Sequence, residues 1–264
     1  MSEPDLPGDS DDSDGGDGWT RAFYETPVAM ALLPAAAPEI DERVACIGRA
    51  LKLRGGERVL DQCCGAGSLA LALARKGHAV AGVDISSAFI ERARADAAAQ
   101  ALDADFACAD ATRWSAPVPC DAGFNWGTGF GCAADDAFNR AMLERAFDSL
   151  RPGARFALDY YNVAGVLAGF RERFAYERDL DGRRVRVERR SVLDLERGLL
   201  HQDWSFHDAG RVTAMPRTTT RLYLPAELAG LLAATGFAVE GFLGGYDGRA
   251  LDLQAPRCIA IARK

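Results

Sequence analysis

Apolar residues recur along this chain at two different spacings. At Ile40, Val44, Ile47 and Leu51 the spacing is three or four residues, which predicts a helix over residues 38–51. Short apolar runs and helical patterns then alternate: strands are predicted over 59–60, 80–84, 105–110, 121–127 and 155–160, and helices over 67–77, 87–98, 136–150 and 225–234. This alternation is typical of an α/β fold with a parallel sheet.

The alternation of helix and strand stops after the fifth strand. Over residues 174–223 the pattern is that of strands, with charged and apolar residues alternating over 184–188. Asp-Gly at 181–182 and Ala-Gly at 209–210 indicate hairpin turns. We therefore expect a small antiparallel sheet inserted at 174–223. The last two strands, predicted over 237–242 and 258–262, would form an antiparallel hairpin that closes the main sheet.

The turn after the first strand carries the strongest chemical signal. Asp61 lies at the carboxyl end of that strand, and Gly65 and Gly67 allow the backbone to approach a ligand closely. A carboxylate at Asp61 would repel a pyrophosphate but would attract a cofactor that carries an amine and a sulfonium. Asp84 ends the second strand about 20 residues further on, where a carboxylate accepts hydrogen bonds from ribose hydroxyls.

These residues resemble the motifs of class I S-adenosylmethionine-dependent methyltransferases. The first motif of that family is usually Leu-Asp-x-Gly-Cys-Gly-x-Gly; here Cys63 replaces the first glycine, whereas Cys64, Gly65 and Gly67 match. The resemblance covers roughly residues 40–160 and resumes near 221–264. It implies a Rossmann-like sheet of order 3-2-1-4-5-7-6, with S-adenosylmethionine as the cofactor.

Ligands of such sheets bind beyond the carboxyl ends of the strands, where the strand order reverses. This rule and the resemblance together predict a set of cofactor-binding residues: Asp61, Cys63, Gly65, Gly67, Asp84, Ile85, Asp110, Ala111 and Asn125. In the family, the acidic residue at the position of Asp110 contacts the adenine amino group.

The acceptor is expected on the side of the fourth and fifth strands. We predict that Trp19, Trp126 and Phe130 bind the substrate, since aromatic faces can hold a cationic amine or sulfonium. The loop 128–131 resembles a Ser-Phe-Gly-Tyr loop of family members that methylate small natural products.

Methyl transfer from a sulfonium mainly requires orientation of the two reactants and exclusion of water. An amine nucleophile must also lose a proton, and three side chains are predicted to assist: Asp159, Tyr160 and Tyr24. No cluster with metal-ligand spacing is present, and the predicted step needs no metal.

The N-terminal 18 residues differ in composition from the rest. They contain seven of the 38 acidic residues and no Lys or Arg, so the remaining chain has 38 − 7 = 31 acidic and 31 basic residues and is neutral. We expect residues 1–18 to be disordered and residues 19–264 to form the methyltransferase domain. Trp19, Phe23 and Tyr24 then form an aromatic segment, which is either a lid over the cofactor or a hydrophobic anchor for the first helix.

Because residues 19–264 carry no net charge, they have no electrostatic reason to bind nucleic acid or an anionic membrane. No stretch approaches the 18 or so apolar residues of a membrane span, and no signal peptide is evident. Seven cysteines without CxxC spacing indicate a reducing compartment, so a cytoplasmic location is expected.

The sequence thus predicts transfer of a methyl group from S-adenosylmethionine to a small molecule, with an amine nitrogen of an amino acid or secondary metabolite as the favoured acceptor. Oxygen or sulfur acceptors are the first alternative. A nicotinamide-dependent oxidoreductase and a non-enzymatic cofactor-binding protein are alternatives of a different class. The inserted sheet is also a candidate contact surface for a homodimer.

Overall fold

A computed structural model describes residues 17–26, 37–127, 129–180 and 183–264. Its larger sheet has seven strands in the order β11-β12-β5-β4-β1-β2-β3. The strands are β1 (Arg58–Gln62), β2 (Ala79–Asp84), β3 (Ala104–Cys108), β4 (Cys120–Asn125), β5 (Leu150–Tyr160), β11 (Ala238–Leu243) and β12 (Cys258–Arg263). β12 is antiparallel to both β5 and β11, whereas β1 to β5 are parallel. This confirms the predicted order 3-2-1-4-5-7-6.

Helices cover both faces of this sheet and bury two apolar clusters. On one face lie α3 (Ala37–Leu51), α4 (Ser68–Ala74) and α5 (Ser87–Ala99), whose buried side chains pack with Val59, Val80 and Phe124. On the other face lie α6 (Asp136–Asp148) and α8 (Pro225–Ala234), which pack with Leu60 and Phe156. The sheet is therefore buried on both sides, as its near-continuous apolar strands require.

The boundary between α6 and β5 differs from the prediction. The helix ends at Asp148 rather than at 150, and β5 begins at Leu150 rather than at 155. The pairing of β4 with β5 shifts between Cys120 and Ala122, so the strand runs through Pro152-Gly153 by means of this irregularity. A proline can occupy such a position because the ladder is locally interrupted there.

The second sheet is inserted between β5 and α8, as predicted. It consists of β6 (Arg173–Leu180), β7 (Arg183–Asp194), β8 (Leu199–Asp208), β9 (Arg211–Ala214) and β10 (Thr218–Arg221). All its pairings are antiparallel, and a short helix, α7 (Val163–Ala168), leads into it. The hairpin predicted at 209–210 joins β8 to β9, whereas residues 181–182 lie outside the described residues.

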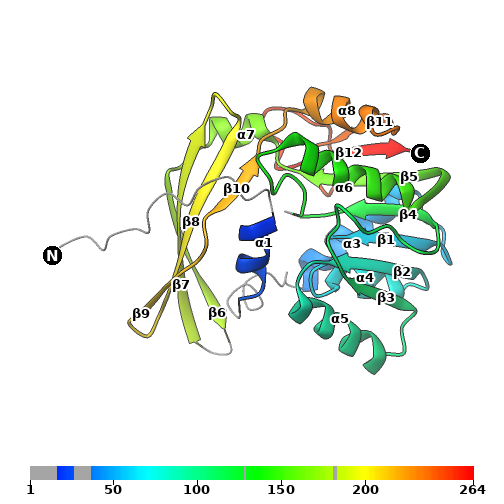
Figure 1. Ribbon diagram of the computed structural model, residues 1–264, viewed down its shortest axis with the longest axis horizontal. Helices are drawn as coiled ribbons and strands as arrows, with labels where there is room; N and C mark the ends of the chain where they lie inside the picture. The colour runs from blue at the N-terminus through cyan, green and yellow to red at the C-terminus, as the bar shows by residue number, and fades with distance from the viewer. Residues whose placement is uncertain (1–16, 27–36, 128, 181–182) are drawn as a thin grey trace.

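The first helix stands between the two sheets (Figure 1). This helix, α1 (Asp17–Tyr24), places Phe23 in an apolar cluster with Phe89 of α5 and Val187 of β7. Trp19 donates a hydrogen bond from Nε1 to the Cys132 carbonyl over 3.0 Å. The aromatic segment is thus anchored to both halves of the molecule. α1 begins two residues inside the predicted tail, and residues 1–16 lie outside the described residues.

No described helix combines the length and the apolar character needed to cross a membrane.

Candidate active site

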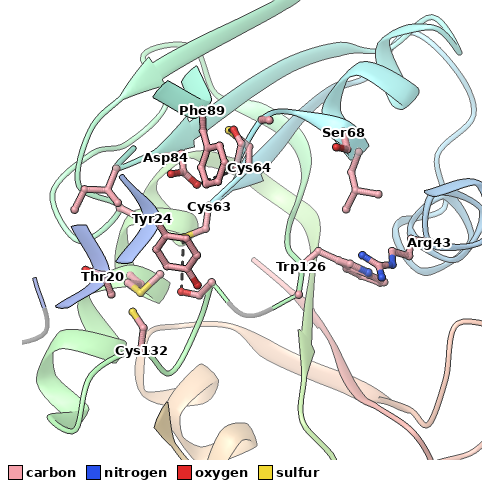
Figure 2. A pocket seen from close by; sticks show the side chains of 18 of the residues that line it. Thr20, Tyr24, Arg43, Cys63, Cys64, Ser68, Asp84, Phe89, Trp126 and Cys132 are labelled. Atoms are coloured by element: carbon pink, nitrogen blue, oxygen red, sulfur yellow. Dashed lines mark hydrogen bonds between the residues drawn. The ribbon is translucent and has the colours of Figure 1, made fainter. Parts of the chain in front are cut away.

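A cavity of about 410 Å³ opens at the carboxyl ends of β1, β2 and β4. Its floor is the β1–α4 loop, and α1 borders it on the side of the second sheet. Asp84, Phe89 and Tyr24 lie at one end, and Trp126 and Arg43 lie at the other (Figure 2). The cavity therefore sits where the strand order reverses, as expected for a ligand site of an open α/β sheet.

The glycine turn is built from three residues with left-handed backbones. Cys63, Gly65 and Gly67 have φ values of 63°, 54° and 76°. A Cβ on Gly67 would come within 3.0 Å of the Phe106 ring, so the close packing of α4 on β3 requires glycine there. Cys63 keeps the backbone conformation that the usual glycine would adopt. Cysteine in place of the first glycine of the motif therefore leaves the turn intact, although a non-glycine residue in a left-handed conformation is strained.

Asp84 is held in a fixed orientation at the end of β2. Its Oδ2 accepts a hydrogen bond from the Gly65 amide at 2.8 Å, and its Oδ1 accepts one from the Ser86 amide at 3.0 Å. Burial raises the pKa of this carboxyl. Because a carboxylate has about four acceptor positions, two remain for ligand hydroxyls.

Asp61 lies beneath the loop rather than at the cavity surface. It is 2% exposed, and its Oδ2 has no hydrogen-bond partner among the described residues. Burial, together with the neighbouring charge of Asp84, raises its pKa to about 8. A cationic ligand above the loop would favour the ionised form, so Asp61 is suited to an electrostatic role.

Asp110 and Ala111 line the cavity beyond β3, together with Thr112. Asp110 Oδ1 accepts hydrogen bonds from the amide and the hydroxyl of Thr112, at 2.8 and 2.7 Å. Phe138 and Met142 of α6 also line the cavity. A planar base would therefore meet apolar side chains and a carboxylate edge.

The opposite end of the cavity contains donors that the sequence did not reveal, apart from Trp126. The Trp126 and Tyr246 rings stack with centroids 5.7 Å apart, and the Arg43 guanidinium lies 5.7 Å from the Tyr246 centroid. Both Trp126 Nε1 and Arg43 Nε are buried without an acceptor among the described residues. Since buried donors are normally paired, this end is suited to an anionic group such as a carboxylate.

Asp159 lies behind these rings and accepts hydrogen bonds from residues of the cavity wall. Its side chain is fully buried and accepts hydrogen bonds from Arg257 Nε at 2.7 Å, the Tyr246 hydroxyl at 3.0 Å and the Gly127 amide at 3.1 Å. Arg257 and Tyr246 line the cavity, whereas Asp159 does not. The prediction that Asp159 assists an acceptor directly is therefore corrected: it holds residues that do face the cavity.

Phe130 and Tyr160 also lie in the core instead of at the cavity. Each is 1% exposed, and their rings lie 5.8 Å apart, with Tyr223 packed against both. The Tyr160 hydroxyl donates to the Arg221 carbonyl, and burial raises its pKa well above the usual range. The segment after β10 covers both residues, which the strand-end position alone did not indicate.

Of the predicted site residues, the structure brings one group together around the cavity: Tyr24, Cys63, Gly65, Asp84, Ile85, Asp110, Ala111 and Trp126. The others lie behind the wall or away from it: Trp19, Asp61, Gly67, Asn125, Phe130, Asp159 and Tyr160. Asn125 is fully buried and donates to Gln62 Oε1 at 3.2 Å.

Comparisons with known proteins bear on the fold and on the class of enzyme. Residues 59–153 match a protein family described as "Methyltransferase domain". The CcbJ methyltransferase from Streptomyces caelestis is similar in structure, with a TM-score of 0.77 and 19% identity over 92% of this chain and 98% of that chain. The sugar N-methyltransferase KedS8 from Streptoalloteichus sp ATCC 53650 has a TM-score of 0.69 and 18% identity over 100% of this chain and 98% of that chain.

A curated relative is larger than this chain. The 23S rRNA (uracil(1939)-C(5))-methyltransferase RlmD of Alkalilimnicola ehrlichii (strain ATCC BAA-1101 / DSM 17681 / MLHE-1) is 37% identical over 157 residues. The match covers 56% of this chain but 30% of that protein's length. The family match is confined to residues 59–153, which is less than half of this chain. The family match supports the predicted methyltransferase class. Two further proteins of similar structure, CalS10 and the glycopeptide N-methyltransferase MtfA, bind S-adenosylmethionine.

Proposed function

We propose that this protein transfers a methyl group from S-adenosylmethionine to an amine nitrogen of a small molecule, an amino acid or a secondary metabolite. The observation that carries the proposal is the roof over the cavity. Thr20 and Tyr24 line the cavity from α1, while Phe23 of the same helix packs into the second sheet. A cavity closed in this way suits a small acceptor better than a polymer.

The charge of the chain and one comparison support the same choice. Residues 19–264 carry equal numbers of acidic and basic side chains, so they provide no overall attraction for RNA. KedS8, to which the chain is similar in fold, is named a sugar N-methyltransferase. The likeness to the rRNA enzyme RlmD covers part of this chain, and the roofed cavity argues against a similar substrate here.

The cavity residues fit the three parts of the cofactor. Asp84 has free acceptor positions for the ribose hydroxyls, and Asp110 with Ala111 borders the space for adenine. Arg43 and the Trp126 N–H provide donors for the methionine carboxylate at the other end. When bound, the cofactor supplies an activated methyl group on a sulfonium.

The protein's own contribution is then orientation and exclusion of water. Tyr24 is the one predicted catalytic side chain that lines the cavity, so we propose that its hydroxyl accepts a hydrogen bond from the acceptor amine. Tyr160 cannot fill this role, since its hydroxyl is already bonded to the Arg221 carbonyl inside the core.

The proposal is tested by incubating the protein with S-adenosylmethionine and a panel of small amines, each with its matched alcohol and thiol. We expect S-adenosylhomocysteine to form with at least one amine, and the product to gain one methyl group on nitrogen by mass spectrometry. Methylation of alcohols or thiols alone would replace the nitrogen acceptor. Calorimetric binding of a nicotinamide cofactor, but not of S-adenosylmethionine, would contradict the methyltransferase assignment.

Two shortened chains test the role of α1. A chain that begins at Gly18 keeps Trp19, Phe23 and Tyr24 and should retain full activity, because its contacts to Cys132 and to the second sheet remain. A chain that begins at Glu25 should lose activity by about tenfold or more, since an apolar contact of this size contributes about 1.5–3 kcal/mol. Equal turnover of the two chains would show that α1 does not close the site.

A further inference from the structure

On the inner face of the second sheet, Arg189 lies among apolar and aromatic residues. On β7, Val185 and Val187 point toward α1 and α5, and Arg189 continues the same alternating face. Its neighbours across the sheet are Phe174 of β6 and Trp204 of β8. The Arg189 guanidinium lies 5.5 Å from the Phe174 ring centroid and 5.4 Å from that of Trp204. The two rings hold the cation in place by cation–π contact.

Among the described residues, no carboxylate pairs with this arginine. Within the described part of the chain it makes no ion pair, and its Nε is buried without an acceptor. Arg186 and Arg190 provide the contrast, because they are exposed and pair with Glu188 at 2.8 Å and Glu172 at 3.3 Å. An inward arginine with unused donors is costly unless a ligand provides the acceptor.

Arg189 also lines a second cavity, of about 370 Å³, between the sheet and α7. Ser191 and Gln202 contribute polar groups from the same sheet face. Phe170 and Phe174 form an apolar rim and are 37% and 40% exposed. Arg171 also lines the cavity, but its side chain is exposed. The cavity therefore combines cationic groups with an open apolar surface, and this combination suits an anion that carries an apolar group.

Tyr161 packs against an arginine of the cofactor cavity. It directly follows β5, and the Arg257 guanidinium, which lines the cofactor cavity, lies 5.6 Å from its ring centroid. Burial raises the pKa of Tyr161, while the charges of both Arg257 and Arg189 oppose that rise. The positive charges of both arginines thus act on the same tyrosine.

We propose that Arg189 binds an anionic group of the acceptor, a carboxylate or a phosphate, while the apolar part of the acceptor contacts Phe170 and Phe174. This inference rests on the proposed function, because it adds an anionic group to the small amine that is methylated. Arg189 would then determine specificity at a distance from the transferred methyl group, and its planar donors suit both anions.

Binding is measured by calorimetry on the S-adenosylhomocysteine complex, with phenylacetate, phenyl phosphate and the neutral phenylacetamide as probes. We expect at least one anion to bind about tenfold or more tightly than the amide. Arg189→Gln should remove that preference, whereas Arg190→Gln, on the opposite face of the same strand, should leave it unchanged. The better anion identifies the group. Equal binding of all three probes, or an unchanged preference in Arg189→Gln, would overturn the proposal.

Two further measurements separate this inference from the proposed function and from misfolding. Arg189→Lys keeps the charge and should retain part of the anion preference, and all three variants should bind S-adenosylmethionine with unchanged affinity. If anion binding depends on Arg189 but no amine is methylated, the role of Arg189 in anion binding stands and the proposed nitrogen acceptor is wrong. If amines are methylated with no preference for those that carry an anionic group, the role of Arg189 in acceptor binding is wrong and the proposed function stands.

Discussion

Asp159→Asn is expected to lower the free energy of unfolding by about 3–5 kcal/mol, because it leaves a buried guanidinium without its counter-ion. The Asp159 side chain is fully buried, and Arg257 is 18% exposed. The substitution also weakens the acceptor for the Tyr246 hydroxyl and the Gly127 amide. Denaturant titration followed by circular dichroism measures the change.

The matched control for this substitution is an ion pair at the surface. Asp203 pairs with Arg217 at 2.8 Å, and the two side chains are 30% and 49% exposed. Asp203→Asn should therefore cost about 1 kcal/mol or less. A double-mutant cycle of Asp159→Asn with Arg257→Gln should show coupling of about 0.5–3 kcal/mol. Losses of equal size for Asp159→Asn and Asp203→Asn would mean that the buried network does not stabilise the cavity wall.

Asp84→Ala is expected to weaken S-adenosylmethionine binding by roughly 30–150-fold. This factor corresponds to hydrogen bonds of about 2–3 kcal/mol between a charged carboxylate and the ribose hydroxyls, at 1.4 kcal/mol for each factor of ten. The same carboxylate also fixes the glycine turn through the Gly65 amide. Calorimetric titration of the variant with S-adenosylmethionine gives the affinity directly.

Asp96 offers a control for the loss of a carboxylate. It lies on α5, away from the cavity, and pairs with Arg92 at the surface. Asp96→Ala should leave the dissociation constant for S-adenosylmethionine unchanged. The affinity of Asp84→Asn should lie between that of Asp84→Ala and that of the unaltered protein, because asparagine keeps one acceptor oxygen. An unaltered affinity in Asp84→Ala would show that the ribose binds elsewhere.

The sequence predicted the half of the site that is encoded by local motifs. The positions of Asp84 and Gly65 follow from one strand and one turn, because residues at the end of a parallel strand must face the ligand edge of the sheet. The sheet order and the inserted strands were likewise recoverable from alternating apolar patterns. These features depend on neighbours in the sequence, and so a single chain reveals them.

The opposite wall could not be predicted in the same way. Arg43, Tyr246 and Arg257 come from α3, from the segment after β11 and from the residue before β12. No spacing relates them, since the tertiary fold alone brings them together. Tyr246 and Arg257 both bond to Asp159, a residue that sequence position alone places at the reacting centre.

Phe130 and Tyr160 show why strand-end residues are not always site residues. The rule that carboxyl ends face the ligand assumes that nothing else covers them. Here Tyr223, in the segment that leads from β10 to α8, packs on both rings and removes them from the cavity. An insertion can therefore shift the acceptor side of the site, while the cofactor side keeps its position because the first three strands fix it.

The most direct test of the account is a crystal structure of the protein with S-adenosylhomocysteine. We expect the ribose hydroxyls to lie within hydrogen-bond distance of Asp84, adenine to lie beside Asp110 and Ala111, and the amino-acid carboxylate to reach Arg43. The sulfur should face the space beneath Tyr24 and the second sheet. A complex in which the ribose does not contact Asp84, or in which the sulfur faces away from that roofed space, would contradict the account.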